Sequence, residues 1–210
     1  MSSILSPNQD NVKLYLPFSE GSGTTAYDYS GEANNGTITG ATYVKVQDGD
    51  YALDLNGSTS YMLVDDSSSL DITNDFTILI WIYQTENTAI NYQRRIIGKP
   101  GRTNGISYHP SQNSIYIGDG TTNQIIDTIT RDVWHLIVYT QSASVSKVYI
   151  DKVLKHTGTL NIDWNNTDDV YIGGGDTNRY LNGLIRLPVI LNTVVTQAFI
   201  DKFYQETFIQ

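Results

Sequence analysis

Three loop segments of the chain carry the kinds of side chain that bind sugars. Aromatic rings stack on the apolar face of a pyranose, and amide, carboxylate and guanidinium groups pair with its hydroxyls. The sequence therefore predicts carbohydrate-binding residues in these segments: Trp164, Asn165 and Asn166 in one, Asp176, Arg179 and Tyr180 in the next, and Tyr108 and His109 in a third.

The first two segments flank one short predicted strand, Val170 to Ile172. Loops at the two ends of a strand leave a sheet on opposite sides unless the strand bends, so these segments are not expected to share one site. For Trp164 a second interpretation is open, in which the indole closes one end of the fold. Trp81 and Trp134 lie within apolar strands and are expected in the core.

Several acidic residues in turns raise the question of a calcium site. Calcium is held by carboxylate, amide and carbonyl oxygens that converge from loops, and Asp28, Asp168, Asp169 and Asp176 offer such oxygens. The alternative is ordinary turn chemistry, in which Asp28 bonds into the Ser30-Gly31 turn. We keep Asp28 as the candidate metal ligand and expect no cofactor to be required beyond a structural calcium ion.

The residues needed for catalysis are absent or scattered. The four glutamates, Glu20, Glu32, Glu86 and Glu206, lie far apart, and the chain has no cysteine. The three histidines show no His-x-x-x-His metal spacing, and no Gly-x-Ser-x-Gly motif is present. The sequence therefore predicts a protein that is not an enzyme.

Composition narrows the class of partner. The net charge is -9, and Arg94-Arg95 is the only basic doublet, so there is no cluster to replace the counterions of nucleic acid. Hydrophobic residues make up 40% of the chain, but their runs are too short to cross a bilayer, so no membrane insertion is expected. Met1 to Asp10 show no basic start or apolar core of a secretory signal.

Short runs rich in Ile, Val, Tyr and Thr alternate with Gly- and Asn-containing turns along the whole chain. This pattern is typical of an all-β sandwich or barrel. The predicted strands lie near Val12 to Phe18, Thr42 to Val46, Ala52 to Leu55, Tyr61 to Val64, Phe76 to Tyr83, Arg95 to Ile97, Ile106 to Tyr108, Ser114 to Ile117, Gln124 to Ile126, Val133 to Tyr139, Lys147 to Ile150, Val153 to His156, Val170 to Ile172 and Asn182 to Ile190.

The segment from Tyr51 to Gln84 predicts how the elements are joined. Asn56-Gly57 suggests a hairpin between the strands on either side, and the next strand, Phe76 to Tyr83, is apolar throughout and should be covered on both faces. Near the end, Thr196 is expected to cap one short helix that packs as a lid on the sandwich rim. Residues 1–210 are expected to form one domain, with 1–11 as a flexible N-terminal arm.

Several blocks in order resemble the concanavalin A-like lectin/glucanase superfamily, in particular its laminin-G-like jelly rolls. The blocks are Leu14 to Phe18 with Asp28-Tyr29-Ser30-Gly31 and Asn34-Asn35-Gly36, Ala52 to Gly57 with Phe76 to Trp81, Trp134 to Tyr139 with Val148 to Asp151, and Val170 to Gly174 with Leu181 to Ile185. The resemblance implies a two-sheet antiparallel jelly-roll β-sandwich. Two departures stand out: Lys152 replaces a turn glycine, and Arg186-Leu187-Pro188 replaces acidic residues that would support a calcium site.

The resemblance implies a non-enzymatic, lectin-like module whose partner is a glycan or another cell-surface ligand, outside the cell or on a virion surface. The alternative is a structural or adhesion protein of a virus or phage particle that contacts other protein subunits. A glycoside hydrolase of the same superfamily comes third, since the strand motif Glu-x-Asp-x-x-Glu that supplies the two carboxyl groups of such enzymes is missing.

Overall fold

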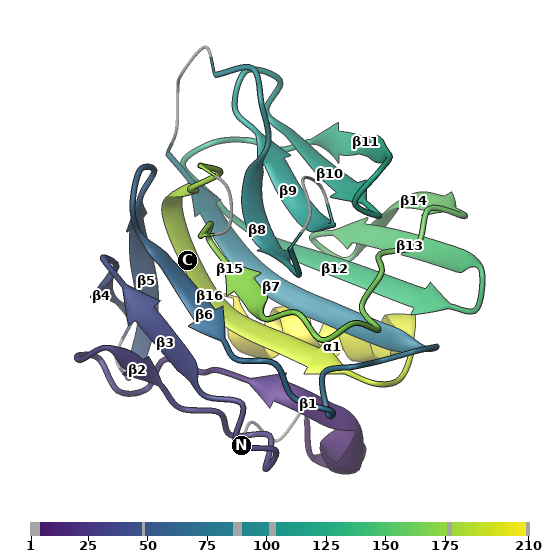
Figure 1. Cartoon of the computed structure of the whole chain (residues 1–210), viewed down its shortest axis with the longest axis horizontal. Coiled ribbons are helices and arrows are strands. Elements are labelled where there is room, and N and C mark those ends of the chain that lie inside the picture. Colours follow the sequence, from purple (N-terminus) through teal and green to yellow (C-terminus); the bar gives the residue numbers. More distant parts are fainter. Residues whose placement is uncertain (1–4, 48, 86–89, 101–103, 176–177, 209–210) are drawn as a thin grey trace.

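The computed structural model describes residues 5–47, 49–85, 90–100, 104–175 and 178–208. Two antiparallel sheets of eight strands each lie face to face, as expected for a jelly-roll sandwich (Figure 1). Sheet A runs in the order β14 (Val153–Gly158), β13 (Val145–Ile150), β12 (Trp134–Ser142), β7 (Phe76–Gln84), β16 (Asn182–Leu191), β5 (Asp50–Asn56) and β4 (Thr42–Gln47), and β1 (Val12–Tyr15) also pairs with β16.

Sheet B supplies the other face of the sandwich. Its order is β11 (Asn123–Thr128), β10 (Ser114–Gly118), β9 (Gly105–His109), β8 (Arg94–Gly98), β15 (Val170–Ile172), β6 (Tyr61–Val64), β3 (Gly36–Thr39) and β2 (Thr25–Ala26). The short strands β2 and β3 were not predicted, because the turn-rich sequence around them hides two brief pairings.

Strand β7 is buried on both faces, which confirms its expected place inside the molecule. Ile78, Ile80 and Ile82 point into the inner core between the two sheets. Leu79 and Trp81 point the other way, into a second cluster beneath helix α1 (Gln197–Thr207). Thr196 caps this helix as predicted, since its hydroxyl accepts a hydrogen bond from the Phe199 amide at 3.2 Å.

The place of helix α1 differs from the expectation. Ile200 and Phe203 pack on the outer face of sheet A, so the helix covers a sheet face and does not close the rim (Figure 1). The indole of Trp81 donates to the Thr207 hydroxyl at 2.9 Å and ties the end of the helix to the sheet. Within the described ranges, no helix has the length and hydropathy needed to cross a bilayer.

The predicted hairpin at Asn56-Gly57 is wrong. Strand β5 pairs with β4 and β16 in sheet A, whereas β6 pairs with β3 and β15 in sheet B. The chain therefore crosses between sheets at this point. The side-chain oxygen of Asn56 accepts hydrogen bonds from the amides of Ser58, Thr59 and Ser60, and these bonds hold the corner.

The N-terminal residues do not form a free arm where the structure describes them. Ser6–Asn11 form a 3-10 helix, η1, and the side chain of Leu5 is fully buried in the cluster beneath α1. This burial anchors the segment against sheet A. Residues 1–4 lie outside the described part of the chain.

The two departures from the family pattern carry local costs. Lys152, at the turn between β13 and β14, has a φ of 73° that a glycine would adopt without strain. Arg186 is almost fully buried in β16, where its guanidinium donates to the Thr207 carbonyl at 2.7 Å and faces Asp50 at 3.4 Å. Burial lowers the pKa of Arg186 to about 10.

Candidate functional site

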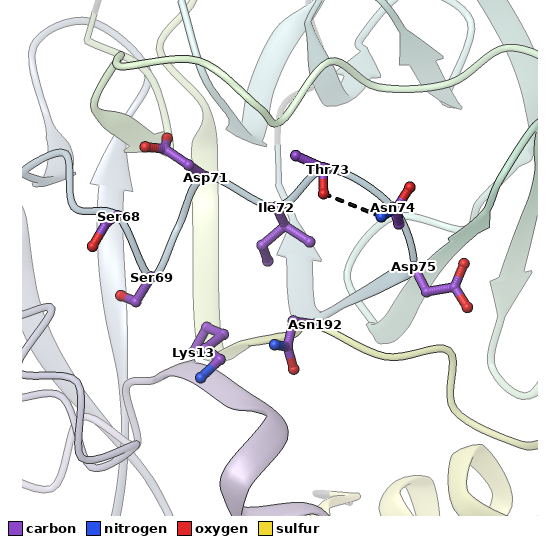
Figure 2. Close-up of a pocket in the computed structure, with 9 residues that line it drawn as sticks. All are labelled: Lys13, Ser68, Ser69, Asp71, Ile72, Thr73, Asn74, Asp75 and Asn192. Atoms are coloured by element: carbon purple, nitrogen blue, oxygen red, sulfur yellow. Dashed lines mark hydrogen bonds between the residues drawn. The ribbon is translucent and has the colours of Figure 1, made fainter.

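A pocket of about 520 Å³ opens at one end of the sandwich, and we call it the polar pocket. Three segments form it: the loop that joins β6 to β7, the start of β1, and the residue that follows β16. Figure 2 shows the residues that line it, which are Lys13, Ser68, Ser69, Asp71, Ile72, Thr73, Asn74, Asp75 and Asn192.

The fold holds the two sides of this pocket in place. The β6–β7 loop crosses from sheet B to sheet A, and the buried side chain of Leu70 fixes it to the inner core. On the other side, β1 pairs with β16, and the Asn192 amide donates to the Asn11 carbonyl at 2.9 Å. This pairing sets Lys13 and Asn192 side by side.

The lining is rich in groups that both donate and accept hydrogen bonds. Hydroxyls and amides have this dual character, and carboxylates accept only. Figure 2 shows the Ile72 side chain pointing toward Lys13 and Asn192, while the carboxylate of Asp71 points away from them. The amide of Asn74 donates to the Thr73 hydroxyl at 3.2 Å. The pocket can therefore hold a ligand with many hydroxyls against one aliphatic side chain.

Lys99, which follows β8, fixes the back of the β6–β7 loop. Its side chain is fully buried, and its ammonium group donates to Asp71 at 3.0 Å and to the Asn166 carbonyl, with Asp66 at 3.7 Å. The Asp66 amide also donates to the Asp169 carboxylate at 2.9 Å. We call Lys99 and these partners the lysine clamp. It joins the pocket loop to the loop that contains Asn165 and Asn166.

Trp164 does not offer a surface for a sugar, and this part of the predicted site is corrected. Its side chain is 1% exposed and belongs to the inner core, with its ring 5.8 Å from that of Phe76. The indole closes the end of the sandwich, as the second interpretation had it. Asn165 is exposed and Asn166 half-buried beside it.

Tyr108 and His109 are also buried and cannot contact a ligand on the surface. Tyr108 lies in the inner core and donates through its hydroxyl to Asn113 at 2.8 Å. His109 is 4% exposed and packs against the ring of Tyr116 at 5.5 Å. Burial lowers the pKa of His109. Alternation along β9 did not reveal this, because all five residues of the strand are buried.

Arg179 and Tyr180 lie at the far end of β15 from Asn165 and Asn166, so the expectation of two separate places holds. The Arg179 guanidinium is buried and donates to Gln93. Tyr180 is half-buried, and its ring lies 6.3 Å from that of Tyr61. Asp176 lies outside the described residues.

Asp28 uses its carboxylate to hold the chain together. One oxygen accepts from the amides of Tyr15 and Ser30, and the other accepts from the Ser30 hydroxyl and the Asn34 amide. Both oxygens are thus engaged, and the bond from the Ser30 amide is the turn contact expected as the alternative for Asp28. The described residues contain no group of three or more His, Cys, Asp or Glu placed to hold a metal ion.

Sequence reasoning missed most of the polar pocket. Its residues are small, polar and common in turns, and Lys13 and Asn192 come from opposite ends of the chain. One signal was present: residues 65–75, dense in Asp, Ser and Asn, stand between two strongly apolar strands. Loops of that length and composition between strands often carry function.

Comparison with known proteins places the chain in a family. The laminin-G-like model Laminin_G_3, described as concanavalin A-like lectin/glucanases superfamily, matches residues 56–201. The protein therefore belongs to the concanavalin A-like lectin/glucanase superfamily. No curated protein sequence matches the chain.

Solved structures share the fold at low identity. Domain 4 of AbnA, a GH43 extracellular arabinanase from Geobacillus stearothermophilus solved with arabinotriose, has a TM-score of 0.73 at 19% identity and covers 91% of this chain and 97% of that one. The binding domain of Paraclostridial Mosquitocidal Protein 1 has a TM-score of 0.73 at 15% identity over 94% of this chain and 52% of that one. Trypanosoma rangeli sialidase has a TM-score of 0.70 at 14% identity over 92% and 32%.

Proposed function

We propose that the protein is a non-enzymatic, lectin-like module that binds a glycan in the polar pocket. The observation that carries this proposal is the composition of the pocket, whose lining combines hydroxyl, amide and carboxylate groups with a single aliphatic side chain. Sugar hydroxyls both donate and accept, so they can pair with each of these groups. Ile72 supplies a contact for the C–H face of a sugar ring.

The comparisons support this proposal at the level of the fold. One similar domain was solved with arabinotriose, and another is the binding domain of a toxin. Those ligands and roles belong to those proteins. For this chain we infer a glycan that is met outside the cell or at a virion surface.

The placement of the carboxylates supports a binding role over a catalytic one. Glycoside hydrolysis requires two carboxyl groups on either side of the scissile bond. Among the described glutamates, Glu32 pairs with Lys13, Glu206 pairs with Lys202 on α1, and Glu20 accepts from Tyr27 and Tyr43. Asp71 is engaged by Lys99. These ion pairs and hydrogen bonds give each of the four carboxylates a structural partner.

A glycan array followed by calorimetry tests the proposal, with and without calcium. We expect one class of glycan to bind the intact protein, and we expect Ser68→Ala with Asn192→Ala to weaken binding at least tenfold, about 1.4 kcal/mol, with little change in melting temperature. Both side chains are exposed, so their removal should leave the core intact.

The control is Asn178→Ala, an exposed amide on the loop that leads to Tyr180. It should leave binding unchanged. Loss of binding in Asn178→Ala and retention in the pocket variant would move the site to the tyrosines at the other end of β15. If no glycan binds and the protein forms a stable oligomer, the structural role in a virus or phage particle replaces the lectin role.

A further inference from the structure

The charged side chains around the polar pocket affect which charge its ligand can carry. Lys13 is the only cationic side chain among the described residues that line it. The Lys13 ammonium group lies 2.5 Å from the carboxylate of Glu32, and the Lys13 side chain is only 16% exposed. An anionic ligand would therefore have to displace Glu32 before it could pair with this lysine.

The second ammonium group near the pocket, that of Lys99, is not accessible to a ligand. Lys99 faces Asp71 and Asp66 from behind the loop, and its side chain has no exposed surface. It offsets the charge of these aspartates without presenting a donor to the pocket. Asp75 adds another carboxylate at the rim, where it is exposed. The positive charges of Lys13 and Lys99 are thus outnumbered by the four carboxylates around this opening: Glu32, Asp66, Asp71 and Asp75.

We propose that the polar pocket selects uncharged glycans and rejects those that carry carboxylate or sulfate groups. This inference rests on the proposed function and adds the chemical class of the ligand. A neutral hydroxyl can donate to the carboxylates at the rim and accept from the amides of Asn74 and Asn192. An acidic sugar brings a like charge toward the exposed Asp75, and Lys13, the only cation among the described lining residues, is already paired with Glu32.

Matched pairs of oligosaccharides that differ only by one sialic acid or one sulfate group provide the test. We expect the acidic member of each pair to bind about tenfold more weakly than the neutral member at low salt. Because the pocket is open to solvent, raising the NaCl concentration from about 50 mM to about 500 mM should narrow this difference.

Glu32→Gln tests the residue basis of the selection, because it releases the Lys13 ammonium group into the pocket. We expect this variant to bind the acidic glycans about threefold more tightly than the unmodified protein and the neutral glycans as before. The matched control is Glu206→Gln, which makes the same change of charge at the Lys202 pair on α1, far from the pocket. It should leave both affinities unchanged.

The outcomes separate the two proposals. If acidic and neutral glycans bind equally at low salt, or if Glu206→Gln has the same effect as Glu32→Gln, the selection rule is overturned and the glycan-binding function stands. If neither kind of glycan binds, the proposed function is overturned and the selection rule falls with it.

Discussion

Trp164 has a side chain suited to bind a sugar, but it packs in the inner core. Its neighbours in sequence, Asp163 and Asn165, are exposed, so the polar run around it suggests a surface loop. In the fold, the indole turns inward onto Phe76 and fills the end of the inner core. Its ring nitrogen has no hydrogen-bond partner there. The large apolar surface that it buries therefore outweighs one unsatisfied donor.

Replacing Trp164 by alanine should remove this packing. We expect Trp164→Ala to lower the free energy of unfolding by about 3 to 5 kcal/mol, because a large cavity remains in the core. Urea denaturation measures this loss. Trp134→Ala is the control, since Trp134 is only half-buried and should cost less. An unchanged stability together with lost glycan binding would instead make Trp164 a ligand contact.

Burial of His109 predicts that the stability of the fold depends on pH below the ordinary pKa of histidine. Burial lowers the pKa of His109 in the folded state below the ordinary histidine value of 6.5, so the unfolded chain binds the proton more readily. The stability that comes from the neutral ring is present above pH 6.5 and is lost as the pH falls below it. We expect urea denaturation to show lower stability at pH 5 than at pH 7.5.

The variant His109→Gln isolates this contribution, because glutamine does not titrate. Its loss of stability between pH 7.5 and pH 5 should be smaller than that of the unmodified protein. If His109→Gln loses as much stability over this pH range as the unmodified protein does, other groups are responsible.

At the scale of the elements, the lysine clamp explains why a polar loop can form a defined pocket wall. The β6–β7 loop contains few apolar side chains, and Leu70 is its main anchor in the core. The buried ammonium group of Lys99 adds a second anchor, because it donates to both the Asp71 carboxylate and the Asn166 carbonyl. Two loops that are far apart in sequence are thereby held in one arrangement.

Lys99→Met should break the clamp and leave two aspartates without their counterion. We expect a loss of about 3 kcal/mol in the free energy of unfolding, at the low end for buried pairs because the carboxylates are partly exposed. Lys155→Met is the matched control, since its pair with Asp127 lies on the surface and should cost less than about 1 kcal/mol. Equal losses in chemical denaturation would show that the clamp has no special role.

The strands were largely predictable from the sequence, and their connections were not. The apolar run of β7 and the helix cap at Thr196 can both be recognised from the local sequence. The Asn56-Gly57 turn misled because the same dipeptide suits a hairpin and a crossing between sheets. The two connections differ in whether the strands on either side of the turn belong to one sheet or to two. Leu55 and Met62 reach the inner core from opposite sheets, so the chain crosses here.

The candidate site was less predictable than the fold. Aromatic residues were expected on the surface, yet Trp164 and Tyr108 are buried in the inner core. The pocket instead depends on the pairing of β1 with β16, which brings Lys13 beside Asn192. Such a contact between distant strands leaves no local pattern in the sequence.

At the scale of the whole molecule, sheet A is the middle of three layers. Sheet B covers one of its faces through the inner core, and helix α1 covers the other through a second apolar cluster (Figure 1). The cluster beneath α1 includes Trp81 and Leu79 from the central strand. The helix is therefore part of the fold and not a surface addition.

Phe203→Ala tests this third layer. Phe203 is 1% exposed beneath the helix, so we expect its truncation to lower the free energy of unfolding by about 3 to 4 kcal/mol. Phe199→Ala, on the same helix, is the control, because Phe199 is only partly buried and should cost clearly less. A loss in Phe203→Ala as small as that expected for Phe199→Ala would mean that the helix adds little to the stability of sheet A.

The position of β16 has a consequence for how the chain folds. This strand, the last of the two sheets in chain order, lies between β7 and β5 and also pairs with β1, the first strand. On the ribosome, sheet A cannot close between β5 and β7 until Asn182–Leu191 have emerged. Contacts of such long range make folding slow, and they leave the apolar strand β7 in need of protection in the meantime.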